Sequence, residues 1–162
     1  MIQGRLVSEQ KDLILVKDII MKELPSQEFE HYENEAGTQD NVKGNKWKEV
    51  VISALVYEGS DYSCPVAAGT MMLKPENATI TAVAVLKPYR RKQYGDFVMR
   101  ILIDRAKTAG IHDICVKCPE NVTGFFHKLH FEKIGEPYKN MDDSWYVMKH
   151  IPSNTNKCCG II

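Results

Sequence analysis

The chain of 162 residues lacks the features that mark several common classes of protein. Its 21 basic residues balance its 21 acidic residues, so no excess of positive charge is left for a broad nucleic-acid or membrane-binding face. No apolar run approaches the roughly 18 residues that span a membrane. Neither GxxxxGK(S/T) nor GxGxxG occurs, which excludes the usual nucleotide-binding loops. We therefore expect no nucleic-acid partner and no membrane partner, and any basic site must be local.

The cysteines and histidines do not follow a metal-binding pattern. The N-terminus lacks the apolar region of a signal peptide, and five cysteines without an export signal indicate reduced thiols in the cytoplasm. Cys115 and Cys118 match C-x-x-C, but no second pair has ligand spacing. His127 and His130 have no evident carboxylate partner. We expect a cytoplasmic protein without a metal, and no lipid on Cys159, because the terminal CCGII has no basic neighbourhood.

Hydrophobic periodicity predicts one α/β domain over residues 1–151, with a flexible tail at 152–162. The predicted strands span residues 2–7, 47–57, 65–73, 79–86, 113–117, 131–136 and 144–150. The predicted helices run from a cap at Ser8 to Pro25, from Tyr94 to Gly110, and from a cap at Asn121 to His130. The second helix is expected to bury Tyr94, Val98, Ile101, Leu102, Ala106 and Ala109. The polar, acidic segment 26–46 is interpreted as a mobile surface segment that could cover a substrate site.

The most informative stretch is 83–95, VAVLKPYRRKQYG. An apolar strand leads into a loop with three consecutive cations, and that loop opens an amphipathic helix. Free backbone N–H groups at a helix N-terminus, with Arg and Lys beside them, favour a bound phosphate. The alternative is a solvated loop with no ligand. The position between a buried strand and a helix start that contains glycine favours the phosphate site.

These residues resemble the GCN5-related N-acetyltransferase (GNAT) superfamily. Its signature, Q/R-x-x-G-x-G/A between a strand and a helix, resembles Arg90-Arg91-Lys92-Gln93-Tyr94-Gly95. A second family element, an aromatic pair followed by x-Lys-x-Gly-Phe, resembles residues 125–131. The resemblance implies a mixed, mostly antiparallel sheet of about six to seven strands with helices on both faces. It also implies acetyl-coenzyme A as cosubstrate and direct transfer of its acetyl group to an amine.

The resemblance, together with the charges, assigns a set of residues to the cosubstrate. Cations and helix N–H groups suit the phosphates, Gly95 allows a close approach, and main-chain groups of two valines pair with the pantetheine amides. The N–H of Val85 is the implied donor to the oxyanion. The cofactor-binding set is Val83, Val85, Arg90, Arg91, Lys92, Gln93, Tyr94, Gly95, Asp96, Phe126 and Lys128.

Several residues depart from the family pattern. Gln93 stands where the family usually has its first glycine, and a side chain fits there if the backbone stays right-handed. Phe126 stands where many members have a proton-donating Tyr, so a plain core aromatic is the better interpretation; Tyr94 is open to the same interpretation. Pro119 replaces a family Asn, Asn121 lies two positions later, and His130 replaces a Gly before Phe131.

The catalytic residues and the acceptor are left open by the sequence. Glu120, Tyr146 and Glu30 are ionisable candidates for the base that the amine requires, and none is preferred. The acceptor is a small-molecule or peptide amine, and a homodimer is left open as the assembly. The function is therefore predicted as N-acetyl transfer to a primary amine. The alternatives are a catalytically silent acyl-coenzyme A binding module and an interaction protein without a cofactor.

Overall fold

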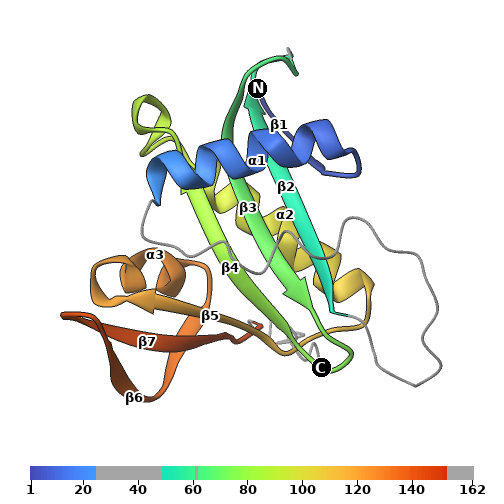
Figure 1. Ribbon diagram of the computed structural model, residues 1–162. Helices are drawn as coiled ribbons and strands as arrows, with labels where there is room; N and C mark the ends of the chain where they lie inside the picture. The colour runs from blue at the N-terminus through green and yellow to red at the C-terminus, as the bar shows by residue number, and fades with distance from the viewer. Residues whose placement is uncertain (25–48, 61, 153–162) are drawn as a thin grey trace, which may run out of the picture.

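The computed structural model describes residues 1–24, 49–60 and 62–152. Within this part of the chain, seven strands form one sheet in the order β1-β2-β3-β4-β5-β7-β6 (Figure 1). The strands are β1 Ile2–Leu6, β2 Val50–Glu58, β3 Pro65–Leu73, β4 Ala78–Val85, β5 Ile114–Pro119, β6 Phe131–Asn140 and β7 Asp143–His150. The helices are α1 Gln10–Glu23, α2 Tyr94–Thr108 and α3 Thr123–Lys128, with the 3-10 turns η1 Lys87–Tyr89 and η2 Glu120–Val122. The predicted mixed α/β fold is confirmed.

Only one pair of neighbouring strands in the described sheet is parallel. β4 and β5 run in the same direction, whereas every other neighbouring pair in the sheet is antiparallel. A parallel pair needs a crossover connection, and α2 provides it between these two strands. The chain after β4 must therefore pass through a loop and a helix before it returns to the sheet.

Helices cover both faces of the sheet (Figure 1). On one face, α1 buries Val16 and Ile20 in a cluster with Leu55 and Ala84 of the sheet. On the other face, α2 contributes its buried residues to the larger core cluster, which also contains Phe126 of α3. α2 turns its apolar stripe to the sheet and its charged side to solvent, whereas α1 also buries Asp12 and exposes Ile14 and Met21. No described helix is long and apolar enough to cross a membrane.

The predicted core of α2 needs two corrections. Ala109 follows the last residue of the helix and is exposed, and Ile101 is only half-buried. Met99 and Ile103 are buried in their place. The reason is that α2 is pressed against β3 at Gly69, which turns the buried stripe towards the sheet centre and leaves Ile101 above the edge strand β1.

Helix ends and one strand also differ from the predictions. α1 begins at Gln10 with Glu9, not Ser8, as its N-cap, and the Glu9 carbonyl accepts the first backbone bonds of the helix. Asn121 caps nothing: it lies within η2, and α3 ends before His130. β6 continues past Pro137 to Asn140, because an edge strand with a register shift tolerates proline. The segment 26–46 lies outside the described residues, as do residues 47 and 48 of the second predicted strand.

The close contact of α2 with β3 gives a stability prediction. A Cβ atom on Gly69 would lie 2.4 Å from Cγ1 of Val98 and 3.3 Å from the carbonyl oxygen of Ala82. We expect Gly69→Ala to lower the free energy of unfolding by about 1–3 kcal/mol, because the helix must move away from the sheet. Urea denaturation measures the change.

Gly124 provides the matched control. It lies in α3, and a Cβ atom added there would meet nothing within 4 Å, so Gly124→Ala should be neutral or stabilise by up to about 1 kcal/mol. Equal midpoints for the Gly69→Ala protein and the unmodified protein would show that the helix contact does not require glycine.

Candidate functional site

The parallel strands β4 and β5 separate after a short common stretch. They are paired only from Ala78↔Ile114 to Ile80↔Val116. β4 then continues to Val85 and β5 to Pro119 without pairing to each other. Beyond Thr81, the edge of β4 therefore has no strand partner on the β5 side, and we call this unpaired gap in the sheet the opening. An extended ligand could pair with the main chain of β4 there.

A bulge in β4 lies where the strands part. Thr70 of β3 pairs with Ala82, but the next residue, Met71, pairs with Ile80, so Thr81 is the extra residue on β4. A bulge bends its strand and increases the local twist, which directs the end of β4 away from β5. The hydroxyl groups of Thr70 and Thr81 are hydrogen-bonded at 2.7 Å across the bulge.

The orientation of the Val85 carbonyl follows from its neighbour. The Leu86 N–H donates to the Val66 carbonyl on the β3 side at 3.0 Å. In a trans peptide the carbonyl points opposite to the N–H, so the Val85 carbonyl points away from β3, towards the opening. Backbone groups alternate along a strand, so Val83 and Val85 are the residues expected to present theirs to the opening.

The ends of β4, α2 and α3 meet at Gly95. A Cβ atom on this residue would lie 3.3 Å from Cζ of Phe125 in α3 and 3.5 Å from Cγ2 of Val85. Glycine therefore lets the first turn of α2 sit against the end of β4 with α3 beside it. The start of α2 is held at the mouth of the opening between the strands.

The loop before α2 contains two residues with left-handed backbone. Gln93 has φ 67° and ψ 11°, and Arg91 has φ 66°. The sequence led us to expect that a side chain fits at position 93 if the backbone there is right-handed. The backbone of Gln93 is left-handed instead. This conformation suits glycine and costs an L-residue of order 1 kcal/mol, which explains why a glycine is usual in the family motif at this position. The turn itself is kept despite the substitution.

The N-terminus of α2 has free donors. Gln93, the N-cap, makes no side-chain capping bond. Within the described part of the chain, no backbone carbonyl accepts from the N–H groups of residues 91–96. These donors and the positive end of the helix dipole can bind an anion such as phosphate.

The three cations of the loop are not equivalent. Arg91 is exposed and has no ion pair among the described residues, and Lys92 lies with Nζ 5.7 Å from the Tyr89 ring centre. Arg90 is held differently: its Nη2 donates to the Glu23 carboxylate, and its Nε donates to the Val85 carbonyl. Arg91 and Lys92 are therefore the cations free to meet a ligand.

The remaining predicted residues lie around this centre without all facing it. Tyr94 is buried against Tyr89, and burial, with a hydrogen bond to Glu58, raises the pKa of its hydroxyl. The Asp96 carboxylate is paired with Arg100 at 2.9 Å. Lys128, at the end of α3, is exposed.

Phe126 is part of the aromatic core. Its ring is buried and packs edge-to-face on Phe125 at 5.1 Å and on Phe131 at 5.8 Å between centroids. It offers packing and no proton, in agreement with the interpretation as a core aromatic.

Two candidate bases lie together beyond the end of β5. Lys133 of β6 lies 3.4 Å from both carboxylate oxygens of Glu120, and its Nζ lies 4.0 Å from the Tyr146 ring centre. A hydrogen bond to Glu120, with burial second, raises the pKa of Tyr146. Glu30, the third candidate, lies outside the described residues.

Sequence reasoning missed two partners at this site, Glu23 and Lys133. Each is far along the chain from the residue that it contacts, Arg90 and Glu120 respectively. No local pattern marks such a pair, because it forms only when α1 or β6 packs into place.

The described residues contain no group of three or more His, Cys, Asp or Glu side chains that could hold a metal ion.

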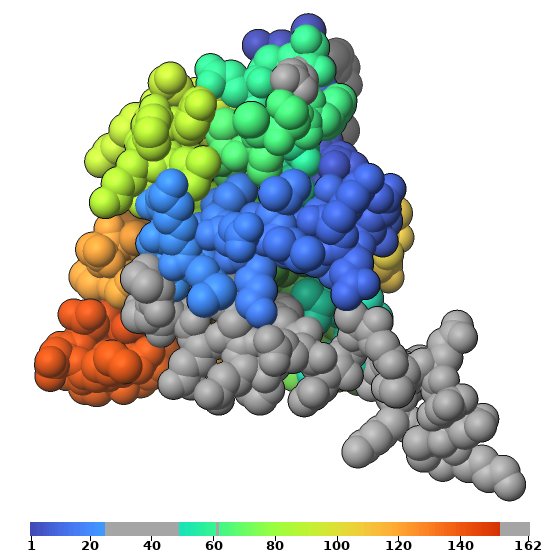
Figure 2. All heavy atoms as spheres, turned by 45° about the horizontal axis from the view of Figure 1, so that its top comes forward, coloured from blue at the N-terminus to red at the C-terminus, as the bar shows by residue number. Residues whose placement is uncertain are grey.

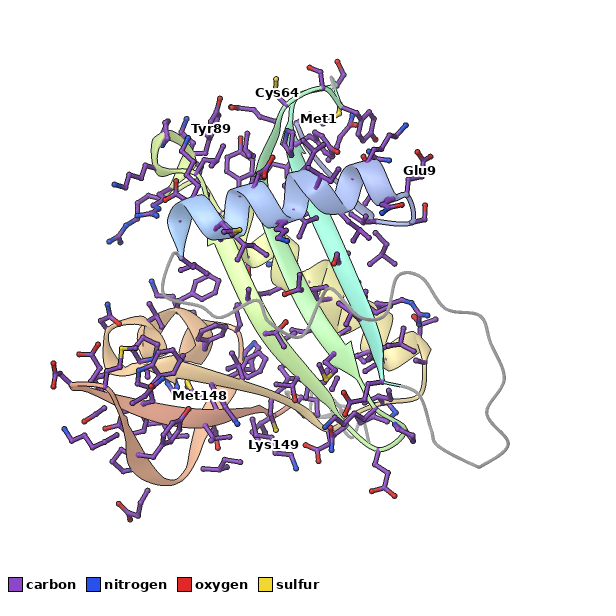
Figure 3. The ribbon with its side chains drawn as sticks, viewed as in Figure 1. Met1, Glu9, Cys64, Tyr89, Met148 and Lys149 are labelled. Atoms are coloured by element: carbon purple, nitrogen blue, oxygen red, sulfur yellow. The ribbon has the colours of Figure 1, made fainter. Side chains whose placement is uncertain are left out.

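Cys118, on the splayed part of β5, gives a chemical prediction. Burial raises its pKa to about 11, so its folded form is thiolate at pH 8 in only about one molecule in a thousand. We expect iodoacetamide at pH 8 to modify exposed Cys64, which points outward near the β2–β3 turn (Figure 3), far faster than Cys118. Peptide mass spectrometry measures both rates.

The pH dependence has a definite sign. Because folding raises this pKa, the thiol favours the folded state below its ordinary pKa of 9, and this contribution is lost as pH rises towards 11. Equal labelling of Cys118 and Cys64 in the folded protein would contradict the buried, protonated thiol.

The sheet thus opens between two parallel strands and has an uncapped helix start at the mouth of the opening. The sequence profile described as the acetyltransferase (GNAT) family matches residues 16–131, which is more than half of the chain. The chain belongs to the GNAT acetyltransferase family. No curated protein matches it significantly.

Solved structures of bacterial proteins share the fold. One is a GNAT acetyltransferase from Elizabethkingia anophelis with acetyl-CoA bound, at TM-score 0.66 and 12% identity over 92% of this chain and 97% of that one. Escherichia coli ElaA matches at TM-score 0.68 and 13% identity, over 93% and 100%. The ribosomal-protein-S18-alanine N-acetyltransferase of Escherichia coli matches at TM-score 0.62 and 15% identity, over 91% and 93%. At these identities the likeness is one of fold.

Proposed function

We propose that this protein is an N-acetyltransferase that takes the acetyl group of acetyl-coenzyme A and transfers it directly to a primary amine. One observation carries the proposal: the opening between β4 and β5 has the uncapped N-terminus of α2 at its mouth. A phosphate site next to a free strand edge suits a long ligand with phosphates at one end and amides along its arm.

Different residues around the opening would bind different parts of acetyl-coenzyme A. The N–H groups of residues 92–96, with Arg91 and Lys92, would hold the pyrophosphate. A Cβ at position 95 would take up space beside Phe125 and Val85, so Gly95 keeps the backbone open for a close approach. Main-chain groups of Val83 and Val85 would pair with the pantetheine arm.

The transfer makes two demands on the protein. The amine must lose a proton before its nitrogen bonds to the acetyl carbon, and the thioester oxygen needs a donor while the C–S bond breaks. The Val85 N–H is the proposed donor. Glu120 and Tyr146 are the proposed proton-transfer groups, since both lie against Lys133, which contacts the carboxylate of one and the ring of the other. The proton released by the amine ends on the departing coenzyme A thiol.

A second candidate function rests on one observation. Phe126, at the place of the proton-donating Tyr of many family members, is enclosed by other aromatic rings and cannot supply a proton. This favours a module that binds acyl-coenzyme A without turning it over.

For the N-acetyltransferase, we also propose the cytoplasm as the compartment and an amine on a small molecule or peptide as the acceptor.

A binding and turnover assay separates the candidates. We expect calorimetric titration to show acetyl-coenzyme A binding, and thiol release to rise with at least one member of a panel of primary amines. In that assay, Glu120→Gln should slow thiol release while leaving acetyl-coenzyme A affinity unchanged. Binding without turnover on a broad panel would favour the silent module, and absence of binding would refute both.

Charge reversal tests the phosphate site itself. We expect the double variant Arg91→Glu, Lys92→Glu to weaken acetyl-coenzyme A binding about 100-fold, since each charge-assisted contact is worth about tenfold or more. Isothermal titration calorimetry measures the change.

The matched control changes the same number of charges elsewhere. Lys74 lies in the β3–β4 turn and is paired with Glu49, which precedes β2. Lys139 lies in β6, and both lysines are exposed cations away from the loop. The variant Lys74→Glu, Lys139→Glu should bind as the unmodified protein does. If both double variants lost affinity equally, net charge and not the loop would be responsible.

A further inference from the structure

Arg90 connects three parts of the molecule through one guanidinium group. Its Nη2 is 2.5 Å from Oε2 of Glu23, the last residue of α1, and its Nε is 3.1 Å from the carbonyl oxygen of Val85, the last residue of β4. The α1 end and the segment after β4 lie together in the space-filling view (Figure 2). Arg90 thus ties α1 and β4 to the loop that precedes α2.

The burial of the two partners is unequal. The side chain of Glu23 is 4% exposed, whereas that of Arg90 is 47% exposed. A phosphate that drew Arg90 away would leave a carboxylate enclosed without its cation, which costs far more than the loss of an exposed ion pair. Arg90 is therefore poorly placed to serve as a phosphate ligand, although it opens the cationic run.

The fixed geometry of the Arg90 guanidinium determines where the loop before α2 lies. Its N–H donors point in fixed directions within one plane, so a contact to Glu23 and a contact to Val85 together define where the Arg90 side chain lies. The next residues, Arg91 and Gln93, take left-handed conformations that an L-residue adopts only when its surroundings enforce them. The double contact of Arg90 is the anchor immediately before that strained turn.

We propose that Arg90 is a positioning residue, which acts through Glu23 to hold the left-handed loop at the N-terminus of α2 and to fix the Val85 carbonyl. Arg91 and Lys92 then meet the phosphates, and Arg90 does not. Because the Val85 carbonyl already accepts from Arg90 Nε, the N–H is the main-chain group of Val85 that can meet the ligand. This inference deepens the proposed function and rests on it where acetyl-coenzyme A is the ligand.

Hydrogen exchange of the protein without ligand tests the anchor by itself. In Glu23→Gln and in Arg90→Gln, we expect the hydrogen-bonded backbone amides of residues 86, 89 and 90 to exchange at least about threefold faster, because the loop loses its tether. Lys11→Gln is the matched control, since it removes the exposed ion pair between Lys11 and Glu9 at the other end of α1. Unchanged exchange of the amides of residues 86, 89 and 90 in Glu23→Gln would overturn the proposal.

A double-mutant cycle in acetyl-coenzyme A affinity separates positioning from direct contact. If Arg90 acts through Glu23, Glu23→Gln and Arg90→Gln each weaken binding about tenfold, and the double variant binds no more weakly than either single one. Arg90→Lys, which keeps the charge next to Glu23, should recover part of the loss. Melting temperatures establish that every variant is folded.

A direct phosphate contact predicts the opposite pattern. Glu23→Gln would then free the guanidinium and leave affinity unchanged or raise it, while Arg90→Gln would still weaken binding, and that result would overturn the proposal. If the unmodified protein bound no acetyl-coenzyme A, the proposed function would fail. Hydrogen exchange without ligand would still decide whether the Glu23–Arg90 contact holds the loop.

Discussion

The separation of β4 from β5 is the constraint on which the site depends. Two parallel neighbours would ordinarily satisfy each other's backbone groups along their shared length, but here pairing stops after Ile80 and Val116. The bulge at Thr81 turns the strand at that point. The main-chain groups of Val83 and the N–H of Val85 face an opening instead of a neighbouring strand, and a ligand with amide groups can replace the missing partner.

The crossover helix places free donors beside this opening, where we propose a charged ligand binds. Because β4 and β5 are parallel, the chain must leave the end of β4 and return through α2, which brings a helix N-terminus to the mouth of the opening. Gly95 lets the helix start close to Val85 and Phe125. The same connection from β4 to α2 therefore places both the strand edge and the free N–H groups. A change in the position of one alters the position of the other.

The sequence predicted most of the fold and part of the site. Alternating apolar residues located six of the seven strands well, and the cationic loop before a helix indicated where we propose a phosphate site, because both are local patterns. It misplaced the cap of α1, the end of β6 and the backbone of Gln93. Those depend on neighbours: an edge position accommodates Pro137, and the anchored loop enforces a left-handed residue where local preference opposes it.

The sequence by itself predicted the class of ligand, since three cations between a strand and a helix start favour phosphate. Tertiary structure decided which cations are available. Arg90 is engaged by Glu23, 67 residues away in the sequence, and Arg91 and Lys92 are not. Likewise, Glu120 and Tyr146 meet only because β7 pairs with β5. Side chains this far apart in sequence are brought together by packing, which no local pattern encodes.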